Sequence, residues 1–242
     1  YHSLQVSGLH KLTGDSSIAA YYTWSKNLTT SINDRTTSPQ NAYDIRSEYQ
    51  LAAFDRRHII SINYIYELPF YRDQRGAVGK LLGGWQISGI ATYNTGLPFT
   101  AVTSNYDAGG LGIVNTNPAA RPDLLCDPNV GGPRTAEQWF NTNCFSRNVA
   151  LVAGQFVPAS NTVGNTGRGN ITGPPTRRFD IVAVKNLRFG EKMRLQLRAE
   201  AFNVFNTTNF RALQTNTTSA AFGQVTTVRD PRTMQFGAKF NF

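Results

Sequence analysis

The chain closes with the ten residues Thr233-Met-Gln-Phe-Gly-Ala-Lys-Phe-Asn-Phe242, in which two kinds of side chain alternate. One set is apolar and consists of Met234, Phe236, Ala238, Phe240 and Phe242. The set between them is polar or small and consists of Thr233, Gln235, Gly237, Lys239 and Asn241. Successive side chains of a β-strand point to opposite faces, so this period predicts a strand with one apolar and one polar face.

The same period recurs in six further segments towards the N-terminus. They lie at about 4–8, 18–24, 59–68, 85–94, 178–188 and 193–205. The segment 178–188 is the weakest, because Lys185 shares a face with Phe179 and Ile181, and its orientation stays open. None of the eleven prolines falls inside the seven segments, as expected of sheet strands, whose ladders need a backbone N–H.

Composition excludes several classes of protein. The 242 residues include 24 Lys and Arg against 15 Asp and Glu, a formal charge of +9, and aromatic residues make up 12%. That aromatic content is too high for a disordered chain. The heptads of a coiled coil are absent, and no stretch approaches the ~18 continuous apolar residues of a transmembrane helix. The remaining class is all-β: a soluble sandwich or barrel, or a membrane barrel whose apolar residues are hidden by alternation.

Short and long connections alternate along the chain. Turns at 13–15, 69–83 and 189–192 are tight or of medium length, whereas 26–56, 97–177 and 206–231 are long. Bacterial outer-membrane barrels have this asymmetry, with short periplasmic turns and long extracellular loops. Several segments also reach the ~9–11 residues of a tilted membrane strand. We therefore expect an antiparallel transmembrane β-barrel portion of about seven meandering strands.

The last eight residues resemble the assembly signal of outer-membrane barrels. That pattern requires a polar residue, a glycine and two aromatic residues, which are Gln235, Gly237, Phe240 and Phe242 here. An amphipathic last strand of this kind suits pairing by β-augmentation, so the barrel-assembly machinery is an expected partner.

Further stretches resemble the C-terminal barrel of TonB-dependent outer-membrane receptors, specifically the Oar-like receptors. They are Phe54-Asp-Arg-Arg-His-Ile-Ile60, Leu82-Gly-Gly-Trp-Gln-Ile-Ser-Gly89, Thr95-Gly-Leu-Pro-Phe-Thr100, Gly164-Asn-Thr-Gly-Arg168 and Arg198-Ala-Glu-Ala-Phe-Asn-Val-Phe-Asn206. Full members of that family have about 22 strands around a plug. The resemblance implies that residues 1–242 are the C-terminal portion of such a barrel, without the plug, in the bacterial outer membrane.

The resemblance also implies a function. The complete protein would import a substrate, which the sequence does not identify, and TonB would act only through the absent plug region. The last strand would end in the periplasm, which makes the long connections extracellular. Seven strands are too few to close a bacterial barrel, so we expect the chain alone to be inactive.

Charged residues at strand ends and on polar faces are candidate sites. Six arginines gather where long connections meet strands: Arg56, Arg57, Arg177, Arg178, Arg229 and Arg232. Arg pairs bidentately with phosphate, so this rim is a candidate contact for lipopolysaccharide; solvation and pairing with loop carboxylates is the alternative. Five further residues are expected to face the lumen, to line a substrate path, contact the plug or form a charge-paired wet interior: Glu67, Arg194, Arg198, Glu200 and Lys239.

The long connection 97–177 contains two local signals. Cys126 and Cys144 form an isolated pair in a polar segment, which predicts a disulfide, with two free thiols as the alternative. Such a bond would stabilise the fold by roughly 3 kcal/mol. Thr135 and Gln138 have the spacing of a capping box, which predicts a short helix through Trp139 and Phe140.

Signals for other classes of function are weak. The three histidines are dispersed, and no phosphate-binding or nucleophile motif is complete, so we expect no enzyme, no metal and no cofactor. The basic residues are spread along the chain, which argues against nucleic acid. Outer-membrane lipid is an expected partner. Two alternative functions stay open: a non-transporting outer-membrane barrel for adhesion or surface interaction, and a secreted soluble all-β binding module.

Overall fold

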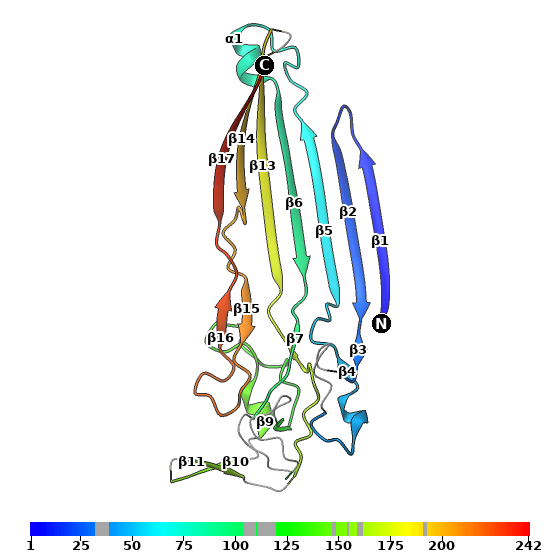
Figure 1. Cartoon of the computed structure of the whole chain (residues 1–242), viewed down its shortest axis with the longest axis vertical. Helices are drawn as coiled ribbons and strands as arrows, with labels where there is room; N and C mark the ends of the chain where they lie inside the picture. Colours follow the sequence, from blue (N-terminus) through cyan, green and yellow to red (C-terminus); the bar gives the residue numbers. More distant parts are fainter. Residues whose placement is uncertain are drawn as a thin grey trace.

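The computed structural model contains one large antiparallel sheet of long strands, with the long connections gathered at one end (Figure 1). It describes residues 1–31, 39–103, 110, 120–146, 149–153, 155–158, 162–190 and 193–242. The strands of this sheet are β1 (His2–Lys11), β2 (Ser17–Lys26), β5 (His58–Glu67), β6 (Trp85–Asn94), β13 (Thr176–Phe189), β14 (Met193–Phe202) and β17 (Thr233–Asn241).

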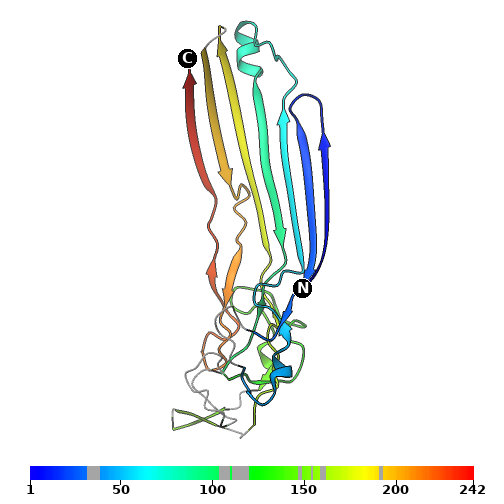
Figure 2. The same cartoon turned by 45° about the vertical axis from the view of Figure 1, so that its right-hand side comes forward.

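The strands follow one another in the sheet in the order in which they occur in the chain, β1-β2-β5-β6-β13-β14-β17. Each of the seven alternating segments of the sequence forms one of them. The sheet is curved and open, with β1 and β17 at its two edges (Figure 2). The N-terminus lies at the end with the long connections, and the C-terminus lies at the end with the short turns (Figure 1). Residues 191–192 of the expected turn between β13 and β14 lie outside the described residues.

Strand register separates the side chains into two faces, because directly paired residues share a face. One row of partners across five strands is apolar or small: Gly8, Ala20, Ile62, Ala91 and Phe179. This apolar face is uncovered over most of its length, and Phe236 is 81% exposed. The opposite, polar face carries most of the charged residues of the strands, although Leu9, Tyr21, Ile65 and Ile90 interrupt it.

The register also settles the orientation of the weakest segment of the sequence. It forms β13, the longest strand, with 14 residues. Lys185 pairs with Trp85 on one side and with Leu197 on the other, so it does belong to the apolar face. It is nevertheless only 6% exposed, because the helix α1 (Gly76–Leu82), within the connection between β5 and β6, covers it. No helix among the described residues is long and apolar enough to cross a membrane.

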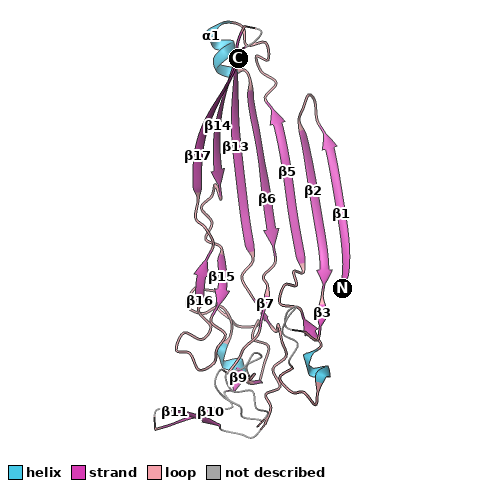
Figure 3. Cartoon of the chain, viewed as in Figure 1, coloured by secondary structure: helices cyan, strands magenta, loops and turns pink. Residues whose placement is uncertain are grey.

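The described residues of 27–57, 95–175 and 203–232, called the cap below, fold against one another beyond the sheet (Figure 3). They contain short elements joined by long irregular segments. These are β3 (Leu28–Thr29), η1 (Ile45–Glu48), β4 (Gln50–Leu51), β7 (Pro98–Phe99), β8 (Asp123–Leu124), η2 (Thr142–Cys144), β9 (Phe145–Ser146), β10 (Val149–Val152), β11 (Gln155–Pro158), β12 (Ile171–Thr172), β15 (Phe210–Leu213) and β16 (Val225–Val228).

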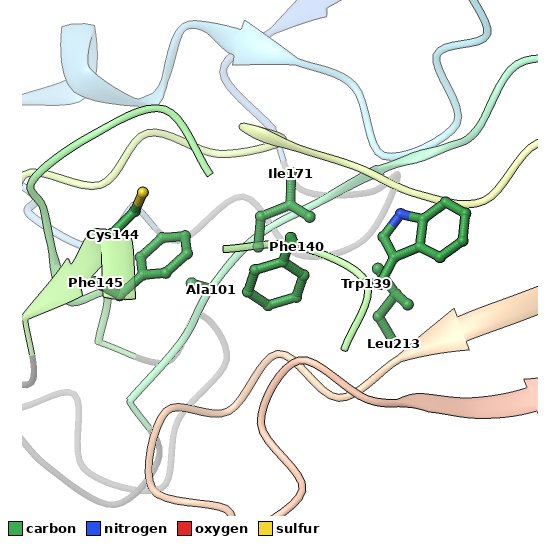
Figure 4. Close-up of a cluster of buried hydrophobic side chains, with 7 residues drawn as sticks. All are labelled: Ala101, Trp139, Phe140, Cys144, Phe145, Ile171 and Leu213. Atoms are coloured by element: carbon green, nitrogen blue, oxygen red, sulfur yellow. The ribbon is translucent and has the colours of Figure 1, made fainter. Parts of the chain in front are cut away.

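The hydrophobic core of the described residues lies in the cap and not in the sheet. Its cluster joins the second and third long connections and consists of Ala101, Trp139, Phe140, Cys144, Phe145, Ile171 and Leu213 (Figure 4). The Phe140 ring is fully buried and makes edge-to-face contacts with Phe145 and Phe222, at centroid distances of 5.9 and 5.3 Å. Of the described buried hydrophobic residues, only Ala19 and Val184 belong to the main sheet.

The prediction of a short helix through Trp139 and Phe140 is wrong. The Thr135 hydroxyl does accept a hydrogen bond from the backbone N–H of Gln138, at 3.2 Å, but no helix follows. The backbone N–H of Trp139 donates to Gly223 O instead, at 2.8 Å. The tertiary contacts of the cap therefore take the backbone groups that a helix would have used.

Candidate functional site

The polar face of the sheet carries the five residues expected to face a lumen: Glu67, Arg194, Arg198, Glu200 and Lys239. The paired row Glu67, Gln86, Val184, Arg198 and Gly237 shows their common side. Glu200 is 7% exposed, forms an ion pair with Arg198 and accepts a hydrogen bond from the side-chain amide of Gln235. These contacts describe a charge-paired polar surface, whereas the role of the five residues in a lumen stays a prediction.

A pocket of about 380 Å³ opens where this polar face meets the cap. Its charged lining residues are the three arginines Arg178, Arg211 and Arg229 and one carboxylate, Asp230. Arginine is the side chain best suited to planar anions such as carboxylate and phosphate. The surplus of positive charge makes this pocket the strongest candidate on the polar face for holding an anionic group.

One wall of the pocket is built by ion pairing within β13. Arg178 Nε lies 2.8 and 2.9 Å from the two carboxylate oxygens of Asp180, and its guanidinium lies 5.7 Å from the centre of the Phe202 ring. Asp180 also accepts a hydrogen bond from the backbone N–H of Asn203, at 2.8 Å. Arg178 is therefore held along the strand rather than free to extend into solvent.

The side chain of Asn209, another lining residue of the pocket, extends the hydrogen bonding of the sheet at the start of β13. Asn209 Oδ1 accepts from the backbone N–H of Arg177 at 2.7 Å, and its Nδ2 donates to Arg177 O at 2.8 Å. The side-chain amide thus makes both hydrogen bonds that a neighbouring strand would make. This contact fixes the third long connection to the start of β13.

The six rim arginines do not form one surface. Arg178 and Arg229 line the pocket, Arg177 belongs to the apolar face with its guanidinium 5.8 Å from the centre of the Tyr93 ring, and Arg232 donates to a backbone carbonyl. Arg57 forms a 3.8 Å ion pair with Asp55.

Arg56 donates to Thr95 O at 2.6 Å. Burial lowers the pKa of Arg56 below its ordinary value, and the positive charge of Arg229 lowers it further. Arg56 and Arg229 are therefore close enough to act on each other electrostatically.

A buried ionic cluster connects the first and second long connections. The carboxylate of Glu48 is fully buried and accepts two hydrogen bonds from Arg121, at 2.8 and 3.0 Å, and one from the backbone N–H of Gln40, at 3.0 Å. Arg168 Nε lies 3.1 Å from Glu48 Oε2, but its N–H does not point at that oxygen, so the contact is ionic. Burial would raise the pKa of Glu48, yet the two guanidinium groups and the Gln40 N–H hold it below the ordinary value.

Two further features fix the position of this cluster. Arg168 donates to Thr29 O at 2.6 Å and to Glu48 O. At Gly164 a side chain is excluded, because a Cβ there would lie 1.8 Å from Arg121 O. The stretch Gly164–Arg168, which carries part of the family resemblance, is thus a structural joint within the cap.

The structure joins Cys126 and Cys144 in a disulfide, with Cα atoms 4.8 Å apart and a sequence separation of 18. Cys144 is fully buried in the core cluster of the cap. Among the described residues, no group of three or more His, Cys, Asp or Glu is placed to hold a metal ion.

Three features were not predicted from the sequence: the Glu48 cluster, the helix α1 and the position of Arg211 in the lining of the pocket. Glu48 is 73 residues from Arg121 and 120 from Arg168, and no local pattern reports such a contact. For α1 a weak signal exists in the apolar residues Ala77, Val78, Leu81 and Leu82, but seven residues carry too little periodicity to identify a helix.

A comparison with protein families agrees with the two faces of the sheet, the asymmetric connections and the open edges. The family model described as outer membrane beta barrel domain matches residues 1–235. The chain belongs to this family. Membership indicates the outer membrane as the location. The match ends at Gln235, so the last residues of β17 lie beyond it. No curated protein and no solved structure matches the chain.

Proposed function

We propose that this outer-membrane domain forms the C-terminal part of the barrel wall of a TonB-dependent receptor of the Oar-like kind, which imports a substrate. The observation that carries the proposal is the open sheet: among the described residues, β1 and β17 have a sheet neighbour on one side only. An open edge in a membrane leaves backbone groups without partners, so the missing strands of a larger barrel must supply them.

The polar face supports transport over a purely structural role. It presents charged residues along β13, β14 and β17 and ends at the arginine-lined pocket beside the cap. In this proposal the short turns are periplasmic, the cap is extracellular, and the pocket lies at the outer mouth of the lumen. The described residues form sheet and cap and no plug, so in this proposal TonB acts through another part of the complete protein.

The test uses the complete protein in outer-membrane fractions. We expect the periplasmic domain of TonB, immobilised on beads, to retain it from detergent extracts. We also expect the 242-residue chain alone, reconstituted in planar bilayers, to give no discrete ion conductance. A complete protein that TonB does not retain, or a monomeric chain that conducts, would contradict the proposal.

A second candidate function is a non-transporting barrel for adhesion, favoured by the folded cap with its own hydrophobic core. A cap of this kind presents a stable surface, as a binding module requires. The two functions differ in the TonB experiment, because an adhesion barrel has no reason to bind TonB but loses cell-surface binding when the cap is removed.

We also propose two partners at the ends of the sheet. Lipopolysaccharide phosphate is expected at Arg177, the rim arginine that belongs to the apolar face, and an Arg177→Ala variant should co-purify with less of it. The barrel-assembly machinery is expected to bind the C-terminal signal formed by Gln235, Gly237, Phe240 and Phe242, and deleting Phe242 should lower the amount of protein in the outer membrane. Unchanged amounts in either experiment would remove that partner.

A further inference from the structure

The helix α1 is fixed to the apolar face of the sheet by donors from two strands. Lys185 Nζ donates to Leu81 O at 2.9 Å and to Gly83 O, and Trp85 Nε1 donates to Leu81 O at 3.1 Å. The Lys185 ammonium also lies 5.1 Å from the centre of the Trp85 ring. These contacts satisfy carbonyls at the C-terminal end of the helix, where a cation is favourable.

The segment before α1 is fixed as well. Gln74 is 5% exposed, donates from Nε2 to Asn186 O at 2.8 Å and accepts from the backbone N–H of Arg188 at 3.1 Å. Since both ends of the helical segment are hydrogen-bonded to β13, α1 has a defined position relative to the sheet.

A groove of about 820 Å³ lies between α1 and the apolar face. Its volume is within the ~300–1,000 Å³ of ordinary ligand sites. Its floor is hollow because small residues occupy neighbouring strands: Ala183 pairs with Ala199, and Ala238 lies one strand further along. Leu81 and Phe236 line its sides. The surface of the groove is therefore suited to a hydrocarbon chain.

The charged residues that line the groove are Lys80, Lys185 and Arg198, of which the strand register places Arg198 on the polar face, and no lining residue among those described is acidic. An ammonium group has three N–H donors, and Lys185 uses two of them for Leu81 and Gly83. The Lys185 ammonium otherwise lies against the Trp85 ring and the residue is only 6% exposed, whereas Lys80 is exposed at the edge of the groove. An exposed ammonium beside an apolar groove matches an anionic group attached to a hydrocarbon chain.

The outer surface of α1 indicates the depth at which this groove lies. Val78 and Leu81 are 59% and 69% exposed, and Leu82 is exposed beside them. A helix with such side chains at the end of membrane strands lies in the interface, where its apolar groups enter the acyl region. Basic pockets at this depth bind the head groups of anionic lipids.

We propose that this groove binds one anionic phospholipid of the inner leaflet of the outer membrane, such as phosphatidylglycerol. One acyl chain lies over the alanine floor, and the phosphate lies beside the ammonium group of Lys80. The choice of leaflet rests on the proposed function, which places the short turns in the periplasm.

The experiment measures lipid binding to the complete protein, purified in detergent and stripped of lipid, by native mass spectrometry. Palmitoyl-oleoyl phosphatidylglycerol is titrated in one arm and phosphatidylethanolamine with the same chains in another. We expect saturable binding of one phosphatidylglycerol. Lys80→Ala should weaken it about fivefold, and Ala199→Phe, which fills the floor with an apolar ring, should abolish it.

Matched variants control for position and residue type. Lys26→Ala removes a lysine of the same face at the opposite end of the sheet, and Ala91→Phe enlarges an outward alanine that does not line the groove. Both should bind phosphatidylglycerol like the unmodified protein. Heat-modifiable gel mobility confirms that each variant is folded.

Three results would overturn the proposal: equal binding of both phospholipids, binding that survives Ala199→Phe, or binding of lipopolysaccharide alone. The sidedness of α1 is measured separately with an Arg75→Cys variant in intact cells. If the cysteine reacts with an impermeant reagent from outside, the proposed topology fails; if it is protected and lipid binding is absent, only the groove proposal fails.

Discussion

Replacing Glu48 with glutamine removes the carboxylate that the cap has buried between two guanidinium groups. Three hydrogen bonds of 2.8 to 3.0 Å end on this carboxylate, and Arg168 adds an ionic contact at 3.1 Å. Arg121 and Arg168 are 4% and 6% exposed, so water cannot replace the lost charge. Removing one partner of a buried ion pair costs about 3–5 kcal/mol, which increases local opening by roughly two to three and a half orders of magnitude.

Hydrogen exchange of the complete protein, followed by mass spectrometry, measures this opening. We expect faster exchange in peptides covering 40–51 and 164–172, because the cluster joins these segments. Peptides of β5 should be unchanged, since the main sheet does not depend on the cluster. Glu137→Gln, an exposed acidic residue of the same cap, is the matched control and should exchange like the unmodified protein. Unchanged exchange around residue 48 would refute the assignment of the cluster as the joint of the cap.

The same cluster predicts a dependence on pH. The pKa of Glu48 is held below its ordinary value of 4.5, so its stabilisation of the cap is complete above pH 4.5. It is lost as the pH falls through the lower pKa of the folded state, because protonation then removes the charge. Acidification below pH 4.5 should therefore lower the protection of the unmodified cap, measured as its exchange rate relative to the intrinsic amide rate at each pH, but have a smaller effect in the Glu48→Gln variant.

Three further changes test the cap and the faces of the sheet. Replacing Cys126 and Cys144 with serine should destabilise the cap by about 3 kcal/mol, seen as greater protease sensitivity, and an unchanged digestion rate would contradict this. Phe140→Ala should cost about 3–5 kcal/mol and accelerate hydrogen exchange in both 97–177 and 206–231, because the ring joins these connections. Ile62→Arg, in the middle of β5, should lower folding yield in lipid vesicles, at a cost of about 2–4 kcal/mol near the midplane, whereas Asn63→Arg on the other face should not; equal yields would show that the faces are assigned wrongly.

The main sheet could be read from the sequence because its strands depend on a local period. In β17, Met234 and Gln235 fall on opposite faces for reasons of backbone geometry alone, and no distant residue changes that. The same period left the orientation of β13 open, because Lys185 interrupts the apolar face of that strand. Its charge is compensated by the carbonyls of a helix that lies about 100 residues earlier in the chain.

The cap could be predicted only as a set of long connections. Its joints are contacts between residues far apart in sequence, such as Glu48 with Arg121, and single residues of this kind carry no periodic signal. The helix expected through Trp139 illustrates the limit, because Gly223 offers that backbone N–H a partner that local propensity does not include. The pocket arginines were found in part, since Arg178 and Arg229 mark strand ends, whereas Arg211 lies inside a long connection.

Because the hydrophobic core lies in the cap and not in the sheet, we expect the cap and the sheet to unfold in separate processes. The cap is stabilised by the exclusion of apolar groups from water, so urea weakens it directly. The strands are stabilised in hydrocarbon, where unpaired backbone groups are so unfavourable that the ladders persist. A single free energy of unfolding therefore does not describe this domain. When the cap unfolds, the strands keep the protein in the bilayer, and the cap can refold from that state.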